Sequence, residues 1–145
     1  MNLKIKEGFG TAANCYQDAL KIRRLVFVNE QHVPLELEID HENAANYFVG
    51  YLGQIPVATA RVTVQRDGAW HIQRVAVLKE YRQQGFASQI LRALERAARK
   101  RQVSYLTLGA QDHAQDFYLK LGYQVIGAGF LDAGIKHHRM DKKLQ

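Results

Sequence analysis

The chain has 145 residues, of which 47% are hydrophobic, and this length and apolar content predict a single domain spanning residues 1–145. No stretch approaches the roughly 18 apolar residues of a membrane span, and the start lacks the apolar region of a signal peptide, so we expect a soluble, cytoplasmic protein. The single cysteine excludes an internal disulfide, and the net charge of +6 calls for an anionic partner such as nucleic acid, an anionic membrane or a phosphorylated cofactor.

Periodic apolar residues divide the chain into predicted helices and strands. In chain order, the pattern predicts a helix over 14–30, strands over 46–52, 57–65 and 70–77, a helix over 86–101, a strand over 103–108, a helix over 112–121 and strands over 123–126 and 135–140. An antiparallel meander followed by alternating strands and helices indicates a mixed α/β (α+β) fold, in which helices pack on a central sheet.

The predicted strand over 70–77 changes phase along its length. Its apolar residues begin on even positions, Trp70 and Ile72, and then move to odd positions, Val75 and Val77. This change predicts a β-bulge, which redirects side chains and is often found next to active sites. A strand buried on both faces near its end would show the same residues.

The segment between this strand and the next helix is suited to binding an anion. A helix N-terminus offers N–H groups without helical partners and the positive end of the helix dipole, which together stabilise a diphosphate. Gly85 allows the backbone to approach phosphates closely, and the small side chain of Ala87 leaves space at the start of the helix. Arg82 can add charge-assisted hydrogen bonds. The segment matches neither the nucleotide P-loop nor the dinucleotide fingerprint. An ordinary tight turn at Gly85 is the alternative.

Two motifs resemble those of one enzyme superfamily. The run Gln73 to Val77, followed by Arg82 to Ala87, resembles the coenzyme A motif Arg/Gln-x-x-Gly-x-Gly/Ala of the GNAT superfamily of N-acetyltransferases. The segment Gln111 to Tyr123 is similar to the superfamily's Asn-x-x-Ala-x-x-Phe-Tyr-x-x-x-Gly-Phe segment, with glutamine in place of the first asparagine. Residues 24–40 and 134–140 resemble a bacterial group of small ElaA-like and YjcF-like proteins.

This resemblance implies the GNAT fold, a twisted and mostly antiparallel central sheet of about six to seven strands with a splayed parallel pair and about four flanking helices. It also implies acetyl-CoA as the co-substrate. The pantetheine arm would pair with the backbone of Val75, Ala76 and Val77, and the N–H of Val77 would face the thioester carbonyl. The residues implied in cofactor binding are Val75, Ala76, Val77, Arg82, Gln83, Gln84, Gly85, Phe86, Ala87, Ser88, Gln111, Phe117 and Tyr118.

Tyr118 is, by the same resemblance, the general acid that protonates the departing coenzyme A thiolate. A tyrosine with a pKa near the ordinary value of about 10 stays protonated at neutral pH and can donate, although a core aromatic residue is the alternative reading. In an extended segment Glu36, Glu38 and Asp40 would line one face and could attract a cationic amine, but a solvated acidic loop would show the same pattern. The candidates for the base that deprotonates the amine are Glu30, Glu36, Glu38, Asp40 and His137.

The favoured function is therefore an N-acetyltransferase that moves an acetyl group from acetyl-CoA to a primary amine, by direct transfer in a ternary complex. The acceptor could be a cationic small molecule. The resemblance also implies a possible homodimer, because proteins of this class commonly form one. One alternative is a non-catalytic domain that binds or senses acyl-CoA, against which Tyr118 argues. Another is a nucleic-acid-binding protein, but the basic residues around 92–101 and 136–143 lack interleaved aromatics. His137 and His138 point to opposite faces of a strand, which argues against a metal site.

Overall fold

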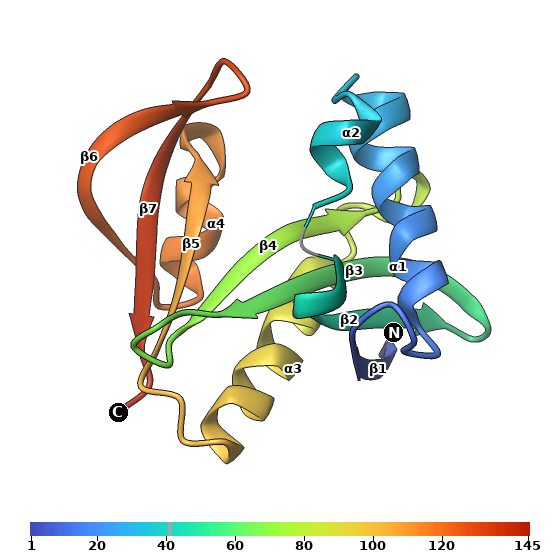
Figure 1. Ribbon diagram of the computed structural model, residues 1–145, viewed down its shortest axis with the longest axis horizontal. Helices are drawn as coiled ribbons and strands as arrows, with labels where there is room; N and C mark the ends of the chain where they lie inside the picture. The colour runs from blue at the N-terminus through green and yellow to red at the C-terminus, as the bar shows by residue number, and fades with distance from the viewer. Residues whose placement is uncertain (41) are drawn as a thin grey trace.

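Figure 1 shows the computed structural model, which describes residues 1–40 and 42–145, apart from the side chains of Glu36 and Leu37. A seven-stranded sheet runs in the order β1-β2-β3-β4-β5-β7-β6. Every neighbouring pair is antiparallel except β4 with β5, so the expected mostly antiparallel α+β fold is confirmed. The strands are β1 (Lys4–Phe9), β2 (Asn46–Leu52), β3 (Ile55–Val64), β4 (Trp70–Val77), β5 (Tyr105–Gln111), β6 (Gln124–Asp132) and β7 (Ile135–Lys143).

Three of the α-helices lie where the apolar periodicity predicts a helix, and the short α2 is an additional one. Within the described residues the α-helices are α1 (Tyr16–Arg23), α2 (Leu35–Glu38), α3 (Phe86–Lys100) and α4 (Gln115–Lys120). A π-helical segment, η1 (Arg24–Glu30), continues α1, and single 3-10 turns are η2 (Glu42–Ala44), η3 (Lys79–Tyr81) and η4 (Asp112–Ala114). No helix in the described part of the chain is long and apolar enough to cross a membrane.

The edge strand β1 is a strand that the sequence pattern does not predict. It pairs with β2 along its whole length. Lys4 and Lys6 are exposed, and Ile5 is only partly buried against the core, so its alternation of apolar and polar residues is weak. Charged side chains of this kind are typical of edge strands, because they discourage pairing with other chains.

The sheet opens between β4 and β5. The two strands pair in parallel only through Trp70 with Leu106 and His71 with Thr107, and then diverge (Figure 1). On its other side β4 shifts register against β3, and Arg74 at this point has a left-handed φ of 56°. The predicted β-bulge is therefore confirmed, and it lies in the part of β4 that has separated from β5.

Hydrophobic side chains pack on both faces of the sheet. Against one face, Ile90 and Leu94 of α3 are fully buried in the cluster that includes Trp70. Against the other, Ile22 of α1 is buried with Tyr47 of β2. Each such aliphatic side chain contributes about 1.5–3 kcal/mol by leaving water. The two helices hold β2, β3 and β4 between them and thereby fix the strand that separates from β5.

Candidate active site

The backbone of β4 is turned towards the side where β5 has moved away. The N–H of Leu78 donates to the carbonyl of Val57 in β3 at 2.9 Å. Because successive N–H groups of an extended strand point to opposite sides, the N–H of Val77 points away from β3, and that of Val75 points the same way. β4 and β5 no longer pair at these residues. An extended ligand can therefore pair with β4 as an added strand would.

The loop that follows β4 ends at a helix N-terminus. Gly85 precedes α3 with a left-handed φ of 79°, and a Cβ at this position would meet no protein atom within 4 Å. The first turn of α3 is closed by the N–H of Gln89, which donates to the carbonyl of Gly85 at 3.2 Å. The N–H groups of Phe86, Ala87 and Ser88 come before this bond and have no helical acceptor. Open space beside these groups is what a diphosphate needs.

The side chains of the loop divide into a buried anchor and exposed polar groups. Phe86 is 2% exposed and belongs to the main core, so only its backbone can face a ligand. Gln83, Gln84 and Gly85 are exposed, and Gln83 also has a left-handed φ of 63°. The buried phenylalanine fixes the position of the loop, while the two glutamines and the glycine remain accessible to solvent.

Arg82 joins the loop to both β4 and η1. Its Nε donates to the carbonyl of Val77 at 3.0 Å, and its two terminal nitrogens donate to the carboxylate of Glu30 at 2.7 and 2.8 Å. The hydrogen bonds from Arg82 lower the pKa of Glu30, which makes this carboxylate a weaker base while the pair is formed. Both residues are partly exposed, so the pair can exchange with solvent or with an anion.

Tyr118 lies in α4, which packs beside β5 (Figure 1). Its ring makes edge-to-face contacts with Phe117 and Tyr123, at centroid distances of 5.0 and 5.7 Å. Burial raises the pKa of Tyr118 to about 12, so the hydroxyl stays protonated at neutral pH. Its side chain packs against the same core as Val75 and Val77, which places the candidate acid and the candidate pantetheine-binding strand around one cluster.

Glu38 occupies a different environment from the one its spacing suggests. Residues Leu35–Glu38 form a turn of helix and not an extended segment, so the alternation of faces expected for an extended chain does not apply here. Glu38 is 2% exposed, and its carboxylate oxygens contact Arg23 at 2.6 Å and Arg74 at 3.1 Å. A substrate amine cannot reach a carboxylate held in this way, so the structure argues against Glu38 as the base. The side chain of Glu36 lies outside the described part of the chain.

The contacts of Glu38 belong to a buried ion-pair network. Arg23 also contacts Glu42 at 2.8 Å, and Glu42 contacts Arg61 at 2.6 Å. Burial alone would raise the pKa of Glu42, but the hydrogen bonds and charges of its arginine partners lower it overall. The network joins α1, α2 and β3 to Arg74, the residue with positive φ in the bulge of β4.

His137 lies on β7 directly opposite Gln111 of β5. Its Nδ1 is 2.7 Å from the carbonyl of Ile135, and its ring stacks on Phe130 at a centroid distance of 5.6 Å. A carbonyl can only accept, so a neutral His137 carries its proton on Nδ1 and keeps the lone pair of Nε2 for another proton. His138 points to the opposite face, where it contacts Asp112 at 2.7 Å. Among the described residues, no group of three or more His, Cys, Asp and Glu side chains could hold a metal ion.

Comparison with known proteins identifies the family. A family model described as an acetyltransferase (GNAT) domain matches residues 12–144. The chain belongs to the GNAT acetyltransferase family. It is 44% identical over 128 residues to YjcF of Bacillus subtilis (strain 168), described as an uncharacterized N-acetyltransferase, and the match covers 87% of this chain and 91% of YjcF. The resemblance that the sequence motifs indicate is thereby confirmed.

Solved structures share the GNAT fold over the whole chain. A crystal structure of a Lactobacillus plantarum protein has a TM-score of 0.90 and 29% identity, with 100% of both chains covered. A GNAT family acetyltransferase from Elizabethkingia anophelis, solved with acetyl-CoA bound, has a TM-score of 0.72 and 12% identity, with 99% of both chains covered. At this identity, the second comparison concerns the fold alone.

The sequence motifs of this GNAT domain do not reveal Arg23 and Arg61, and they include Arg74 without indicating its ion pair with Glu38. Arg23 could have been found from its spacing, because it falls on the same helical face as the buried Ala19 and Val26. A charged residue on a buried face requires a partner, and Glu38 and Glu42 supply it from a segment 15 to 19 residues away. The sequence gives no local signal for that pairing.

Proposed function

We propose that this GNAT protein transfers the acetyl group of acetyl-CoA directly to a primary amine in a ternary complex. The observation that carries the proposal is the divergence of β4 from β5, with the N–H of Val77 turned towards the open side and the Gly85 loop at the end of the same strand. The distant structural neighbour from Elizabethkingia anophelis, solved with acetyl-CoA bound, supports the choice of co-substrate.

The residues at this site fit acetyl-CoA. The backbone of residues 75–77 offers strand-like pairing to the pantetheine arm, and the N–H groups of residues 86–88 offer donors to the diphosphate. Gln83, Gln84 and Gly85 leave this loop open to solvent, and Gln111 stands at the far end of β5. Bound acetyl-CoA supplies the activated acetyl group, and the protein supplies orientation, hydrogen bonds and proton transfer.

Tyr118 is the proposed acid and His137 the preferred base. Burial keeps the Tyr118 hydroxyl protonated, so it can give a proton to a departing thiolate. His137 has Nε2 free to accept the proton of the amine when Nδ1 donates to the carbonyl of Ile135. Glu30 is the second candidate base, because a diphosphate that takes Arg82 as its partner would release the Glu30 carboxylate.

The test combines a binding titration with a kinetic comparison. Wild-type protein should bind acetyl-CoA in a calorimeter and release free thiol from it when a suitable amine is added. Tyr118→Phe should bind acetyl-CoA with unchanged affinity and turn over roughly 10²-fold more slowly, as expected on loss of an acid catalyst. The matched control is Tyr105→Phe, because the Tyr105 hydroxyl contacts Asp67 at the other end of β5.

The two results separate the proposed enzyme from a binding domain. If acetyl-CoA binds and no amine from a broad panel supports thiol release, the protein is a sensor of acyl-CoA and the catalytic proposal fails. If Tyr118→Phe turns over as fast as wild type and Tyr105→Phe, Tyr118 is not the acid. Failure of acetyl-CoA to bind would remove the whole proposal.

A further inference from the structure

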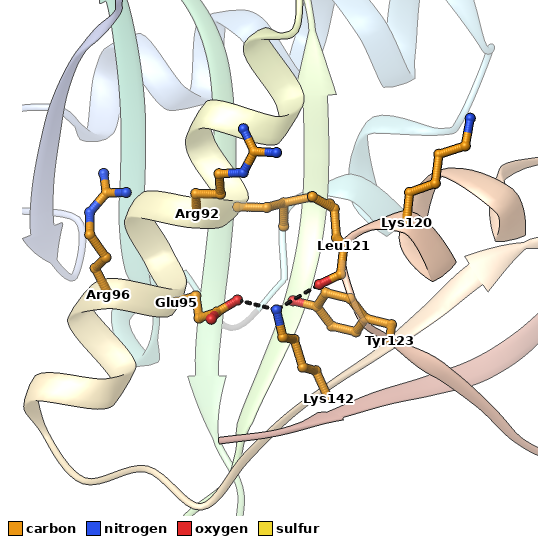
Figure 2. Close-up of a pocket in the computed structure, with 8 residues that line it drawn as sticks. Arg92, Glu95, Arg96, Lys120, Leu121, Tyr123 and Lys142 are labelled. Carbon is orange, nitrogen blue, oxygen red and sulfur yellow. Dashed lines mark hydrogen bonds and ion pairs between the residues drawn. The ribbon is translucent and has the colours of Figure 1, made fainter. Parts of the chain in front are cut away.

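A second candidate anion site, formed by basic side chains, lies along α3 away from the helix N-terminus. A pocket of about 330 Å³ lies between α3, the end of α4 and β7 (Figure 2). Arg92 and Arg96 reach it from α3, Lys120 from α4 and Lys142 from β7. Four cations from three elements thus surround one concave surface, and the sequence motifs assign no role to any of them.

The charges in this pocket are unevenly matched. Lys142 Nζ contacts Glu95 at 2.7 Å and the carbonyl of Leu121 at 2.6 Å (Figure 2). Glu95 is also bonded to Arg99 at 3.0 Å, so this carboxylate is already shared by two cations. Among the described residues no carboxylate pairs with Arg92, Arg96 or Lys120. The pocket therefore keeps an excess of positive charge that an anion would neutralise.

The wall of the pocket contains a polar group without a partner. Tyr123 is 2% exposed, and its buried hydroxyl makes no hydrogen bond within the described chain. In Figure 2 the hydroxyl end of the ring points towards the ammonium group of Lys142 and the carboxylate of Glu95. Buried hydroxyls are nearly always hydrogen-bonded, so a lone one beside a basic pocket indicates a group that a ligand or its water would satisfy.

We infer that this pocket binds a phosphomonoester, namely the 3′-phosphate at the nucleotide end of coenzyme A. The inference rests on the proposed function, because it needs acetyl-CoA to occupy the Gly85 loop. Arg92 lies six residues after Phe86, which places it about 9 Å further along the axis of α3. In coenzyme A a single ribose separates the diphosphate from the 3′-phosphate. With a diphosphate at the start of α3, a phosphomonoester one ribose further along the ligand can extend along the helix towards Arg92.

The two anion sites have separate tasks. The loop site uses backbone N–H groups and recognises any diphosphate, whereas the pocket uses side chains and distinguishes coenzyme A from dephospho-coenzyme A. Two arginines suit this task because a guanidinium group can bind a phosphate through two parallel hydrogen bonds. Lys120 adds a point charge from the facing helix.

The experiment measures this discrimination by calorimetry. Wild-type protein should bind coenzyme A about 10-fold or more tightly than dephospho-coenzyme A, which lacks only the 3′-phosphate. In the triple variant Arg92→Gln/Arg96→Gln/Lys120→Gln the two affinities should become equal, through weaker binding of coenzyme A and unchanged binding of dephospho-coenzyme A.

The control variant removes the same charge elsewhere. Lys4, Lys21 and Lys143 are exposed and lie outside the pocket. The triple variant Lys4→Gln/Lys21→Gln/Lys143→Gln should keep the wild-type preference for coenzyme A, because it loses net charge but none of the pocket residues. A preference that falls equally in both triple variants would show a general effect of charge and overturn the inference.

The remaining outcomes separate this inference from the proposed function. If wild-type protein binds coenzyme A and dephospho-coenzyme A equally, or the pocket variant keeps the preference, the pocket does not bind the 3′-phosphate although the coenzyme A site stands. If neither ligand binds, the proposed function itself is wrong, and the inference about the pocket falls with it. A second experiment titrates wild-type protein with inorganic phosphate. If phosphate binds in the pocket and does not compete with coenzyme A, the pocket is a site for a free anion and the inference is overturned.

Discussion

The substitution Glu38→Gln tests whether this residue holds the structure together or takes a proton from the substrate. It removes one negative charge and keeps the size of the side chain. In the native protein the carboxylate lies between Arg23, which is fully buried, and Arg74 in the bulge. After the change, two guanidinium groups face an amide, and Arg23 keeps its ion pair with Glu42.

The magnitude follows from the burial of this pair. Removing one partner of a buried ion pair typically costs about 3–5 kcal/mol, and we expect the lower end, about 3 kcal/mol, because glutamine retains one oxygen that can accept from Arg23. With a urea m-value of about 2 kcal/mol/M, the midpoint of unfolding should fall by about 1.5 M. The same loss should lower Tm by about 6–12 °C in a domain of this size.

The assay is urea unfolding of wild type, Glu38→Gln and a control at an exposed pair. Glu7 and Arg101 contact each other at 2.6 Å, but their side chains are 27% and 49% exposed, so Glu7→Gln should cost at most about 1 kcal/mol. Equal midpoints for Glu38→Gln and Glu7→Gln would refute the buried-network argument. Wild-type stability combined with lost activity would instead assign Glu38 to the chemistry.

Three further predictions concern the loop, the sheet and the acid. Gly85→Ala should lower the free energy of unfolding by about 1 kcal/mol in the urea assay, because Gly85 has a left-handed φ. The same change should weaken acetyl-CoA binding in the calorimeter by more than about 1 kcal/mol. An unchanged affinity would contradict a close approach of the phosphates to this residue. Burial lowers the pKa of His71, so the unfolded chain takes up a proton at this residue more readily than the folded protein does. The unfolding free energy should therefore fall as the pH drops below about 6.5, the ordinary value for histidine, and continue to fall down to the lowered pKa of the folded protein. This decline, measured from pH 7 to 5, should be shallower in His71→Gln than in the exposed-site control His32→Gln. Burial raises the pKa of Tyr118 to about 12, so the titration of this residue should cause no alkaline decline in kcat up to pH about 10. If kcat of wild type declines below pH about 10 and that of Tyr118→Phe does not, Tyr118 is not an acid with a raised pKa.

The strands and the long helices could be predicted because their information is local. The stripe on α3 and the alternation along β3 each lie within one segment, and both elements are found where the pattern indicates. The bulge could be predicted for the same reason, since the shift of apolar residues from Ile72 to Val75 reflects the side on which each side chain packs. The loop at Gly85 likewise depends on neighbouring residues.

The ion-pair network could not be predicted, because its partners are distant in sequence. Glu38 follows Arg23 by 15 residues and precedes Arg74 by 36, and no spacing rule links them. The acidic residues of this segment suggest an exposed face only if the chain is extended, but a turn of helix places Glu38 in the interior. The pocket beside α3 could not be predicted for a similar reason, since α3, α4 and β7 each contribute only one or two of its cations.

The network and the bulge together suggest why β4 leaves β5 at a fixed place. A non-glycine residue with a φ of 56° is unfavourable by roughly 1 kcal/mol or more, so Arg74 needs interactions that hold it in this conformation. Its contact with the buried carboxylate of Glu38 provides one, and Arg23 anchors that carboxylate to α1. The strand proposed to bind acetyl-CoA is thus tied to the N-terminal helices. Loss of the network should therefore weaken acetyl-CoA binding even in molecules that remain folded. If the network only stabilised the fold and did not position β4, the folded molecules would bind acetyl-CoA as wild type does.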